Sequence, residues 1–457
     1  MTALPEKFMQ AMKKQLPPDE WEAFFAVYGH SPQKGLRVNA LKISAGEFAN
    51  ISPFALRPVP WEKNGYYAEE EKIGSHPYHF AGLYYSQEPS AMCAAPLLDA
   101  KRGEKVLDLC SAPGGKGTQL AAAMAGEGIL VLNEPVFSRA QILSQNVERL
   151  GVKNAVVLSE MPAKLAKFFG GYFDKILVDA PCSGEGMFRK NAKEALGEWS
   201  EENVSMCAAR QKEILVEATK MLAPRGKLVY STCTFSEAED EGQVSDYLQT
   251  HPEMRLVESQ KLYPHKVLGE GHFAALFEKV CEPSEEVCEP SEEVCEPSEE
   301  VAPSRFFPPP LLRPRVFRES EKTYREFERQ ALKTPVGGVL HEAGGMLYAL
   351  PEGVFDWKEL HVLRAGIRLG EVKNGRFEPS HSLAMCLKKD SFKSALDLSL
   401  SDVRTEKFLR GETVTLGAEK PEKGWCGVCV DGFPIGWGKV VGDTVKNHIP
   451  KGLRKFS

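Results

Sequence analysis

Five β-rich segments alternate with helix-capable segments between residues 102 and 280, and this alternation constrains the fold more than any other feature. The β-rich segments span 106–110, 129–134, 155–159, 173–181 and 227–233. Each of the first four is followed by a helix-capable segment, such as 138–151 or 209–224. This order predicts an α/β fold in which a parallel sheet is covered by helices on both faces. Ligands of such sheets bind at the carboxyl ends of the strands, so functional residues are expected directly after each strand.

A glycine-rich turn follows the first strand. The sequence DLCSAPGGKGTQLAAAM (108–124) places three glycines and a proline in the turn and opens a helix behind them. Glycine lets the backbone pass close to a ligand, and the helix N-terminus offers free N–H groups. The pattern matches neither GxGxxG nor GxxxxGK[ST], so a purely structural turn stays an alternative. The second strand ends at Glu134, where a carboxylate can accept hydrogen bonds from a ribose diol or can simply be solvated.

Two further strand ends each present a cysteine. The fourth strand leads into Asp179-Ala-Pro-Cys182, and the fifth leads into Tyr230-Ser-Thr-Cys233. Neighbouring parallel strands should bring both thiols and Asp179 together at one rim of the sheet. A single buried cysteine is most often an inert apolar residue. Two cysteines at adjacent strand ends favour a catalytic role.

The distribution of charge matters more than its sum. The chain has 57 Lys and Arg against 63 Asp and Glu, and this net charge of −6 by itself argues against a nucleic-acid partner. However, residues 281–301 read CEPSEEV three times and hold nine Glu, a composition typical of a disordered spacer. Without this repeat the balance becomes 57 basic against 54 acidic residues. From Ala302 onward, 26 Lys and Arg face 19 Asp and Glu, which favours contact with phosphates.

Cysteine usage and hydropathy indicate the compartment. Three of the eleven cysteines belong to the repeat, and the other eight are too irregularly spaced for a disulfide framework, which indicates a reducing environment. No uninterrupted apolar stretch of about 18 residues occurs, and residues 1–22 carry charge where a signal peptide needs an apolar core. We therefore expect a cytoplasmic protein with no membrane contact. Cys426 and Cys429 form a lone CxxC, and tetrahedral zinc needs four ligands, so no metal is expected.

Four motifs, taken together, carry a family resemblance. They are YSQEPSAM (85–92), DLCSAPGGK (108–116), VDAPCSGEGMFRK (178–190) and VYSTCTF (229–235). The set resembles the RNA 5-methylcytosine methyltransferases of the Nol/Nop/Sun type, and most closely their RsmF-like branch, which acts on small-subunit ribosomal RNA. The resemblance implies a Rossmann-like methyltransferase domain that uses S-adenosylmethionine (SAM), with an N-terminal α+β extension and a C-terminal α+β region ending in a PUA-like RNA-binding domain.

The resemblance and the composition together predict five regions and a monomer. The regions are an N-terminal RNA-binding extension (1–85), a SAM-dependent methyltransferase domain (86–280), a disordered acidic linker (281–304), an accessory domain (305–400) and a PUA-like RNA-binding domain (401–457).

The resemblance also implies roles for individual residues. Asp179 would lie near both the methyl donor and the base, Cys233 would be the nucleophile, and Cys182 would assist breakdown of the covalent adduct. Glu134 would bind the ribose of SAM. The methionine part of SAM would be bound by Cys110, Ser111, Ala112, Pro113, Gly114, Gly115 and Lys116.

One position departs from the family pattern. The family usually has a polar, often acidic, residue that contacts the adenine of SAM after the third strand, where this chain reads LSEMPAK (158–164). Equal spacing places Met161 there, with Glu160 as the nearest carboxylate. Either Glu160 contacts the adenine from the adjacent position, or the adenine is held by packing.

The chemistry of cytosine methylation explains why two thiols are needed. C5 of cytosine is not nucleophilic enough to attack SAM, so a thiolate must first add to C6. Cys233 is the candidate for this step, and Asp179 can stabilise the charge that develops around N3. The C5 proton must then leave so that Cys233 can be expelled, which assigns the second basic group to Cys182. Attack on the face of the base requires an unpaired or flipped-out target.

Other functions remain open at this point. A tRNA cytosine, a DNA cytosine or another nucleophile are alternative substrates, although the second thiol and the basic C-terminal region have no obvious use on DNA. A catalytically idle RNA-binding assembly factor is a further alternative, favoured by the altered 158–164 segment and disfavoured by the presence of both cysteines.

Overall fold

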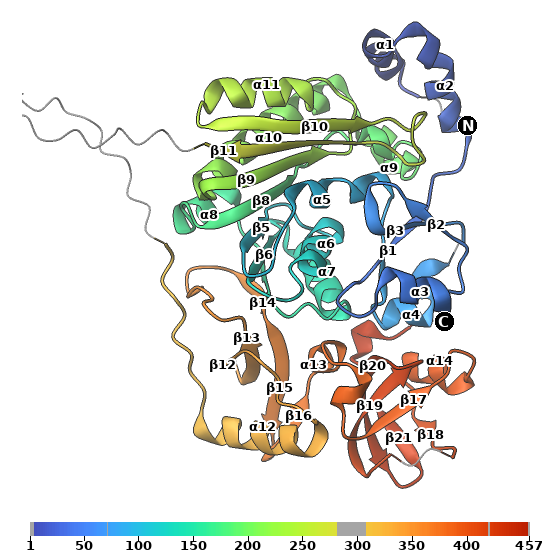
Figure 1. Cartoon of the computed structure of the whole chain (residues 1–457), viewed down its shortest axis with the longest axis vertical. Helices are drawn as coiled ribbons and strands as arrows, with labels where there is room; N and C mark the ends of the chain where they lie inside the picture. The colour runs from blue at the N-terminus through green and yellow to red at the C-terminus, as the bar shows by residue number, and fades with distance from the viewer. Residues whose placement is uncertain (1–3, 71, 281–307, 419–420, 456–457) are drawn as a thin grey trace, which may run out of the picture.

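A computed structural model describes residues 4–70, 72–280, 308–418 and 421–455 (Figure 1). The acidic linker predicted at 281–304 falls outside the described residues. The centre of the described chain is an eight-stranded sheet with the strand order β10-β11-β9-β8-β5-β6-β7-β14. Its strands are β5 (Lys105–Asp108), β6 (Ile129–Asn133), β7 (Ala155–Leu158), β8 (Phe173–Asp179), β9 (Leu222–Thr232), β10 (Met254–Leu262), β11 (His272–Lys279) and β14 (Val362–Ala365).

The five strands predicted from the sequence form the parallel part of this sheet. Strand β5 pairs in parallel with β6 and β8, β6 pairs with β7, and β8 pairs with β9. Strands β10 and β11 extend one edge in antiparallel orientation. The predicted α/β fold is therefore confirmed, and the carboxyl ends of the five parallel strands lie along one rim.

Helices cover both faces of the sheet, as the alternation predicts. Within β6, Ile129 and Val131 belong to one hydrophobic core, whereas Leu130 and Leu132 belong to another, so both faces are buried. The first core includes residues of α8 (Pro162–Phe168), α10 (Glu201–Met221) and α11 (Glu241–Thr250). The second includes residues of α5 (Ala94–Leu98), α6 (Gly115–Ala123) and α7 (Phe137–Arg149).

Two smaller regions flank the central sheet. The N-terminal region holds α1 (Glu6–Gln15), α2 (Trp21–Ala26), α3 (Ala45–Ile51), α4 (Pro77–Phe80), and a sheet of β2 (Leu56–Val59), β3 (Glu62–Ala68), β1 (Gly35–Val38) and β4 (Tyr84–Ser86). The C-terminal region holds one sheet of β12 (Val339–Ala343), β13 (Met346–Leu350), β15 (Ile367–Lys373) and β16 (Arg376–Pro379). Its last sheet consists of β17 (Ala395–Leu398), β19 (Gly424–Val430), β20 (Phe433–Val441), β21 (Thr444–Asn447) and β18 (Val414–Thr415). Helices α9 (Ala192–Glu198), α12 (Arg318–Ala331), α13 (His381–Met385) and α14 (Val403–Leu409) complete the described elements longer than one turn.

The C-terminal region is joined to the central sheet by hydrogen bonds. Strand β14, which lies within the predicted accessory domain, pairs antiparallel with β7 at the edge of the central sheet. Strand β17 pairs with β19, so the predicted limit at 400 falls beside a strand of the last sheet. The domain limits stay predictions, but neither 305–400 nor 401–457 is isolated from its neighbours.

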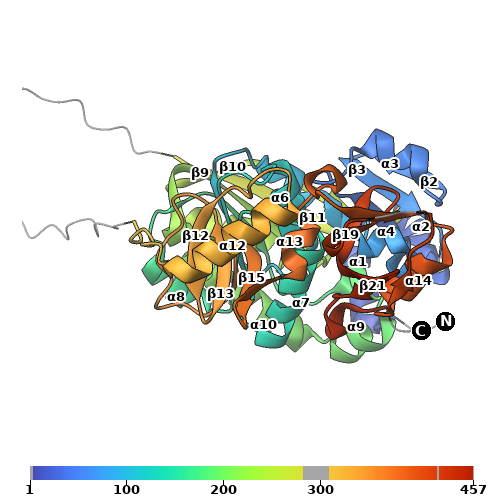
Figure 2. The same cartoon turned by 90° about the horizontal axis from the view of Figure 1, so that it is seen from below.

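The N-terminal and last C-terminal sheets share one hydrophobic core. Leu36 and Val38 of β1 belong to the same buried cluster as Val428 of β19 and Val440 of β20. The Tyr78 hydroxyl donates a hydrogen bond to Asp431 at 2.8 Å across the same boundary. Figure 2 shows these two ends of the chain side by side. Across the described ranges, no helix has the length and apolar character needed to cross a membrane.

Candidate active site

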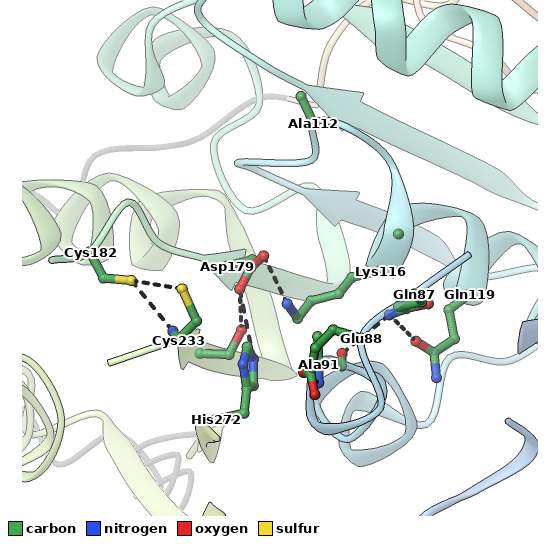
Figure 3. A network of polar contacts seen from close by, with 12 residues as sticks. Gln87, Glu88, Ala91, Ala112, Lys116, Gln119, Asp179, Cys182, Cys233 and His272 are labelled. Carbon is green, nitrogen blue, oxygen red and sulfur yellow. Dashed lines mark hydrogen bonds and ion pairs between the residues drawn. The ribbon is translucent and has the colours of Figure 1, made fainter. Parts of the chain in front are cut away.

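A cavity of about 1210 Å³ opens at the carboxyl ends of the parallel strands. Most of the residues predicted from the sequence line it, and part of its wall is drawn in Figure 3. The predicted residues among its lining are Cys110, Ser111, Ala112, Pro113, Gly115, Lys116, Glu134, Asp179, Cys182 and Cys233. Gly114 and Glu160 do not line the cavity.

The glycine turn brings α6 tightly against the end of β5. Gly114 has φ of 110°, a conformation that favours glycine, and it immediately precedes the helix. A Cβ at Gly117 would lie 2.6 Å from Ser111 Oγ, so this glycine permits a contact that no other residue allows. Asp108 lies buried below the turn with no hydrogen-bond partner for either carboxylate oxygen, and burial raises its pKa to about 7.

The N-terminal sheet supports the turn from behind. Arg37 of β1 is buried and donates hydrogen bonds to the Gly115 carbonyl at 2.5 Å and to Thr118 Oγ1 at 2.8 Å. Burial lowers the pKa of Arg37 to about 10, so the guanidinium stays charged at neutral pH. The predicted N-terminal extension therefore contributes directly to the position of the glycine turn.

Glu134 is a buried carboxylate at the end of β6. One oxygen accepts a hydrogen bond from the Val136 amide at 3.0 Å, and the other lies 3.2 Å from Arg139 Nη1. Arg139 also donates to the Ala112 carbonyl at 3.1 Å, which links the glycine turn to the loop after β6. The carboxylate is held in the wall of the cavity, where a ligand with hydroxyl groups can reach it.

In the loop after β7, Glu160 and Met161, the two residues considered for contact with the adenine of SAM, point in different directions. The Glu160 carboxylate accepts from the His361 amide at 2.7 Å and pairs with Lys164 at 2.7 Å, so it is turned towards the C-terminal region. Met161 is 65 % exposed and lines the cavity together with Pro162. The cavity wall is therefore apolar at the position where the resemblance led us to expect a polar residue.

Asp179 lies at the end of β8 between two donors. Lys116 Nζ from α6 is 2.9 Å from Asp179 Oδ2, and Ser231 Oγ donates to Asp179 Oδ1 at 2.9 Å. Burial lowers the pKa of Lys116, but the attraction of the Asp179 carboxylate is the larger effect, so the pKa of Lys116 lies above its ordinary value. The result is an ion pair within the cavity wall, with the Asp179 side chain still about a third exposed.

The two cysteines face each other beside this ion pair. Their Sγ atoms are 3.4 Å apart, and the Cys233 amide donates to Cys182 Sγ at 3.4 Å (Figure 3). The hydrogen bond with Cys233 and burial raise the pKa of Cys182 well above its ordinary value, so Cys182 keeps its proton at neutral pH. The sequence prediction that both thiols and Asp179 meet at one rim is confirmed.

Short contacts hold the two cysteine loops together. Ser183 Oγ and Thr234 Oγ1 are hydrogen-bonded at 2.8 Å, and the Ser183 amide donates to Glu239 at 2.9 Å. A Cβ at Gly186 would lie 2.8 Å from the Cys233 carbonyl, so glycine is needed for the loops to approach this closely. These contacts fix the distance between the thiols before any substrate binds.

The cavity also contains residues that the sequence analysis did not single out, among them His272, Asp108 and Gln87. His272 opens β11, Asp108 ends β5, and Gln87 follows β4. Asp108 and Gln87 lie inside motifs quoted above but had no assigned role, and their types gave no reason to single them out. His272 is on an antiparallel strand between β10 and β9 and belongs to no motif, so only the pairing of β11 with β9 reveals its position.

Basic residues also line the cavity, and the described residues show where the CxxC cysteines lie and whether a metal site is present. Lys190 and Arg210 line the cavity and provide basic groups near the acidic ones. Cys426 and Cys429 are buried in β19. In the described part of the chain, no group of three or more His, Cys, Asp or Glu is arranged to hold a metal ion.

Family models match four consecutive parts of the chain. A model described as the N-terminal domain of 16S rRNA methyltransferase RsmF matches residues 4–89, and one described as 16S rRNA methyltransferase RsmB/F matches 95–278. The RsmF rRNA methyltransferase first C-terminal domain matches 326–387, and the methyltransferase RsmF PUA domain matches 395–455.

Two solved structures from Pyrococcus horikoshii share the fold. A methyltransferase homolog protein is 26 % identical, with a TM-score of 0.53, and the match covers 61 % of this chain and all of that chain. The structure of NSun6 with SFG is 22 % identical, with a TM-score of 0.55, and the match covers 61 % of this chain and 99 % of that chain.

Curated relatives match over nearly the full length. Ribosomal RNA small subunit methyltransferase F of Vibrio vulnificus is 33 % identical over 98 % of this chain and 97 % of the relative. The protein of the same name from Vibrio cholerae is 32 % identical over 99 % of this chain and 98 % of the relative. The expected resemblance is confirmed, and the chain belongs to the family of ribosomal RNA small subunit methyltransferase F.

Proposed function

We propose that this protein is a SAM-dependent RNA methyltransferase that modifies C5 of cytosine in small-subunit ribosomal RNA through a covalent adduct. The observation that carries this proposal is the pair of thiols, with Sγ atoms 3.4 Å apart, beside the Lys116–Asp179 ion pair in one cavity. Cytosine C5 chemistry needs a nucleophile, a second basic group and a stabiliser of charge on the base. This cavity contains all three groups.

The residues of the cavity fit SAM. The turn from Cys110 to Lys116 would hold its methionine part, and the Glu134 carboxylate would accept from its ribose hydroxyls. Met161 would hold the adenine by packing, since the Glu160 carboxylate is engaged with His361 and Lys164. When bound, SAM supplies the methyl group that C5 of cytosine acquires.

Cys233 would begin the reaction on the RNA. Its thiolate adds to C6 of cytosine, so that a C6–S bond forms and the electron pair of the C5=C6 bond moves towards C5 and N3. N3 takes up a proton from solvent as this charge develops and gives it back when the adduct breaks down, and in between the Asp179 carboxylate accepts the hydrogen bond from N3–H. Lys116 holds Asp179 Oδ2 at 2.9 Å during this step, so the carboxylate need not reorient.

Cys182 would complete the reaction. It accepts the C5 proton, the C5=C6 bond reforms, and the C6–S bond breaks to release Cys233 as a thiolate. In the free protein the hydrogen bond with Cys233 helps to raise the pKa of Cys182 and keep its proton. Conversion of Cys233 to a thioether weakens that hydrogen bond, so Cys182 loses its proton more readily at the stage where a base is needed.

The RNA would reach the cavity as an unpaired or flipped-out nucleotide. Lys190 and Arg210 would contact its phosphates at the cavity. The basic C-terminal region, which matches the RsmF PUA domain, would bind flanking RNA. We propose that the protein acts as a monomer in the cytoplasm, on ribosomal RNA that is free or already assembled into the small subunit.

Measuring the affinity for SAM tests whether Glu134, and not Glu160, binds the cofactor. We expect Glu134→Ala to weaken SAM binding by about tenfold to a hundredfold, because hydrogen bonds to a charged acceptor contribute about 1.5–3 kcal/mol. Glu160→Ala, the same change one strand away, should leave the affinity within about twofold. Titration calorimetry with SAM and the full-length protein measures both. Equal losses in the two variants would contradict the assignment of the ribose to Glu134.

Methyl transfer tests the proposed function directly. The purified protein is incubated with SAM carrying a labelled methyl group and with small-subunit rRNA, intact small subunits, tRNA or single-stranded DNA. Label in rRNA or subunits, located at cytosines by bisulfite sequencing, is the expected result. Label only in tRNA or DNA would contradict the substrate. SAM binding without transfer to any substrate would favour an idle RNA-binding factor.

A further inference from the structure

His272 is a buried histidine whose ring has no hydrogen-bond partner. It lies at the start of β11, next to the carboxyl end of β9, and lines the cavity. The residue is 1 % exposed, and both Nδ1 and Nε2 lack a hydrogen-bond partner among the described atoms. A buried polar group without a partner costs free energy, so its presence in a cavity wall calls for an explanation.

The Asp179 carboxylate is the polar group that His272 faces. Nε2 of His272 is 4.0 Å from Asp179 Oδ1, too far for a hydrogen bond but within reach of a small rearrangement. Figure 3 shows Lys116 and His272 approaching Asp179 from different sides. Hydrogen bonds in catalytic sites are often long in the free enzyme and tighten when substrate binds.

His272 is uncharged at neutral pH and can act as a hydrogen-bond donor. Burial, with a smaller effect from Lys116, lowers the pKa of His272 well below its ordinary value, so the ring is neutral at neutral pH. An ionised carboxylate only accepts hydrogen bonds, so the ring nitrogen that faces Asp179 must carry the proton. Because both ring nitrogens are buried, substrate cannot reach them directly, and His272 acts through Asp179.

We propose that His272 is a positioning residue, whose Nε2–H closes onto Asp179 Oδ1 when the target cytosine binds and holds the carboxylate in place as the acceptor for N3–H of the base. Ser231 Oγ already donates to Oδ1 at 2.9 Å, and Lys116 holds Oδ2. With His272, three donors from three elements would fix the carboxylate, while its exposed side stays open to the base. This inference rests on the proposed function, because it assigns Asp179 to the base.

Two substitutions of His272 in the full-length protein test the proposal. His272→Leu removes the donor, whereas His272→Gln keeps an amide N–H near the position of Nε2. We expect His272→Leu to lower kcat for methyl transfer by about tenfold to a hundredfold, a loss typical of misplaced catalytic groups. The KM for RNA and the affinity for SAM should stay within about twofold. His272→Gln should recover most of kcat, which a role in packing alone does not predict.

His381→Leu serves as the matched control, because His381 is half-buried, with a buried Nδ1 that lacks a hydrogen-bond partner among the described atoms, but does not line the cavity. Its kcat should equal that of the unaltered protein. Should His272→Leu fail to fold, His272→Asn replaces it, since the shorter amide cannot reach Asp179 and should be as defective. A kcat within twofold of the unaltered protein, or equal loss in the Gln variant, would overturn the role of His272. Absence of transfer by the unaltered protein would overturn the proposed function and this inference together.

Discussion

Replacement of Cys233 by alanine should reduce methyl transfer by at least about a thousandfold, because the proposed reaction begins with addition of the Cys233 thiolate to C6. The same variant should form no covalent complex with RNA. Replacement of Cys182 by alanine should instead leave addition and methylation possible but block release, so a covalent protein–RNA complex accumulates. Both thiols sit in loops joined by the Ser183–Thr234 hydrogen bond, so the two variants differ in chemistry rather than in fold.

Denaturing gels with labelled RNA distinguish these outcomes, since only a covalent complex survives denaturation. Cys207→Ala is the matched control, because this buried thiol of α10 does not line the cavity. It should show normal transfer and no accumulated complex. Normal turnover by Cys182→Ala without a trapped complex would refute the division of roles between the two cysteines.

Replacement of Arg364 by methionine should destabilise the protein by about 3–5 kcal/mol, the cost of breaking a buried ion pair. Arg364 of β14 is buried and pairs with Glu148 of α7. It also donates to Ser144 Oγ at 3.2 Å and to Ser382 Oγ at 2.9 Å. Its loss would leave the Glu148 carboxylate uncompensated at the boundary between the central sheet and the C-terminal region.

Urea denaturation followed by circular dichroism measures this effect as a lower midpoint. Arg102→Met, which removes the partner of Glu127 in a pair more than half exposed, should change stability by about 0–1 kcal/mol. Replacing both Arg364 and Glu148 by methionine should recover much of the loss, because an apolar pair leaves no buried charge. Equal midpoints for Arg364→Met and the unaltered protein would show that the pair does not join the two regions.

The sequence predicted the centre of the molecule well, for a physical reason. Strands buried on both faces read as continuous apolar runs, and the cysteines after β8 and β9 follow those runs directly. Parallel pairing then places Cys182, Cys233 and Asp179 at one rim without knowledge of any other contact. The same logic located the glycine turn and Glu134.

The residues that the sequence missed depend on contacts between distant segments. His272 reaches Asp179 only because β11 pairs antiparallel with β9, and Arg37 reaches Gly115 across 78 residues of chain. Glu160 was the natural candidate by residue type, but the His361 amide, 201 residues away, turns its carboxylate from the cavity. No local pattern encodes which of two adjacent side chains faces a cavity and which faces another region.

The core shared by the two ends of the chain sets an order of events during synthesis. Leu36 and Val38 leave the ribosome early, whereas Val428, Val440 and the other residues that cover them are made last. The nascent chain therefore carries an uncovered apolar surface on its first sheet for most of its synthesis. Since Arg37 of that sheet donates to the Gly115 carbonyl, the glycine turn is supported by a sheet whose covering strands are made last.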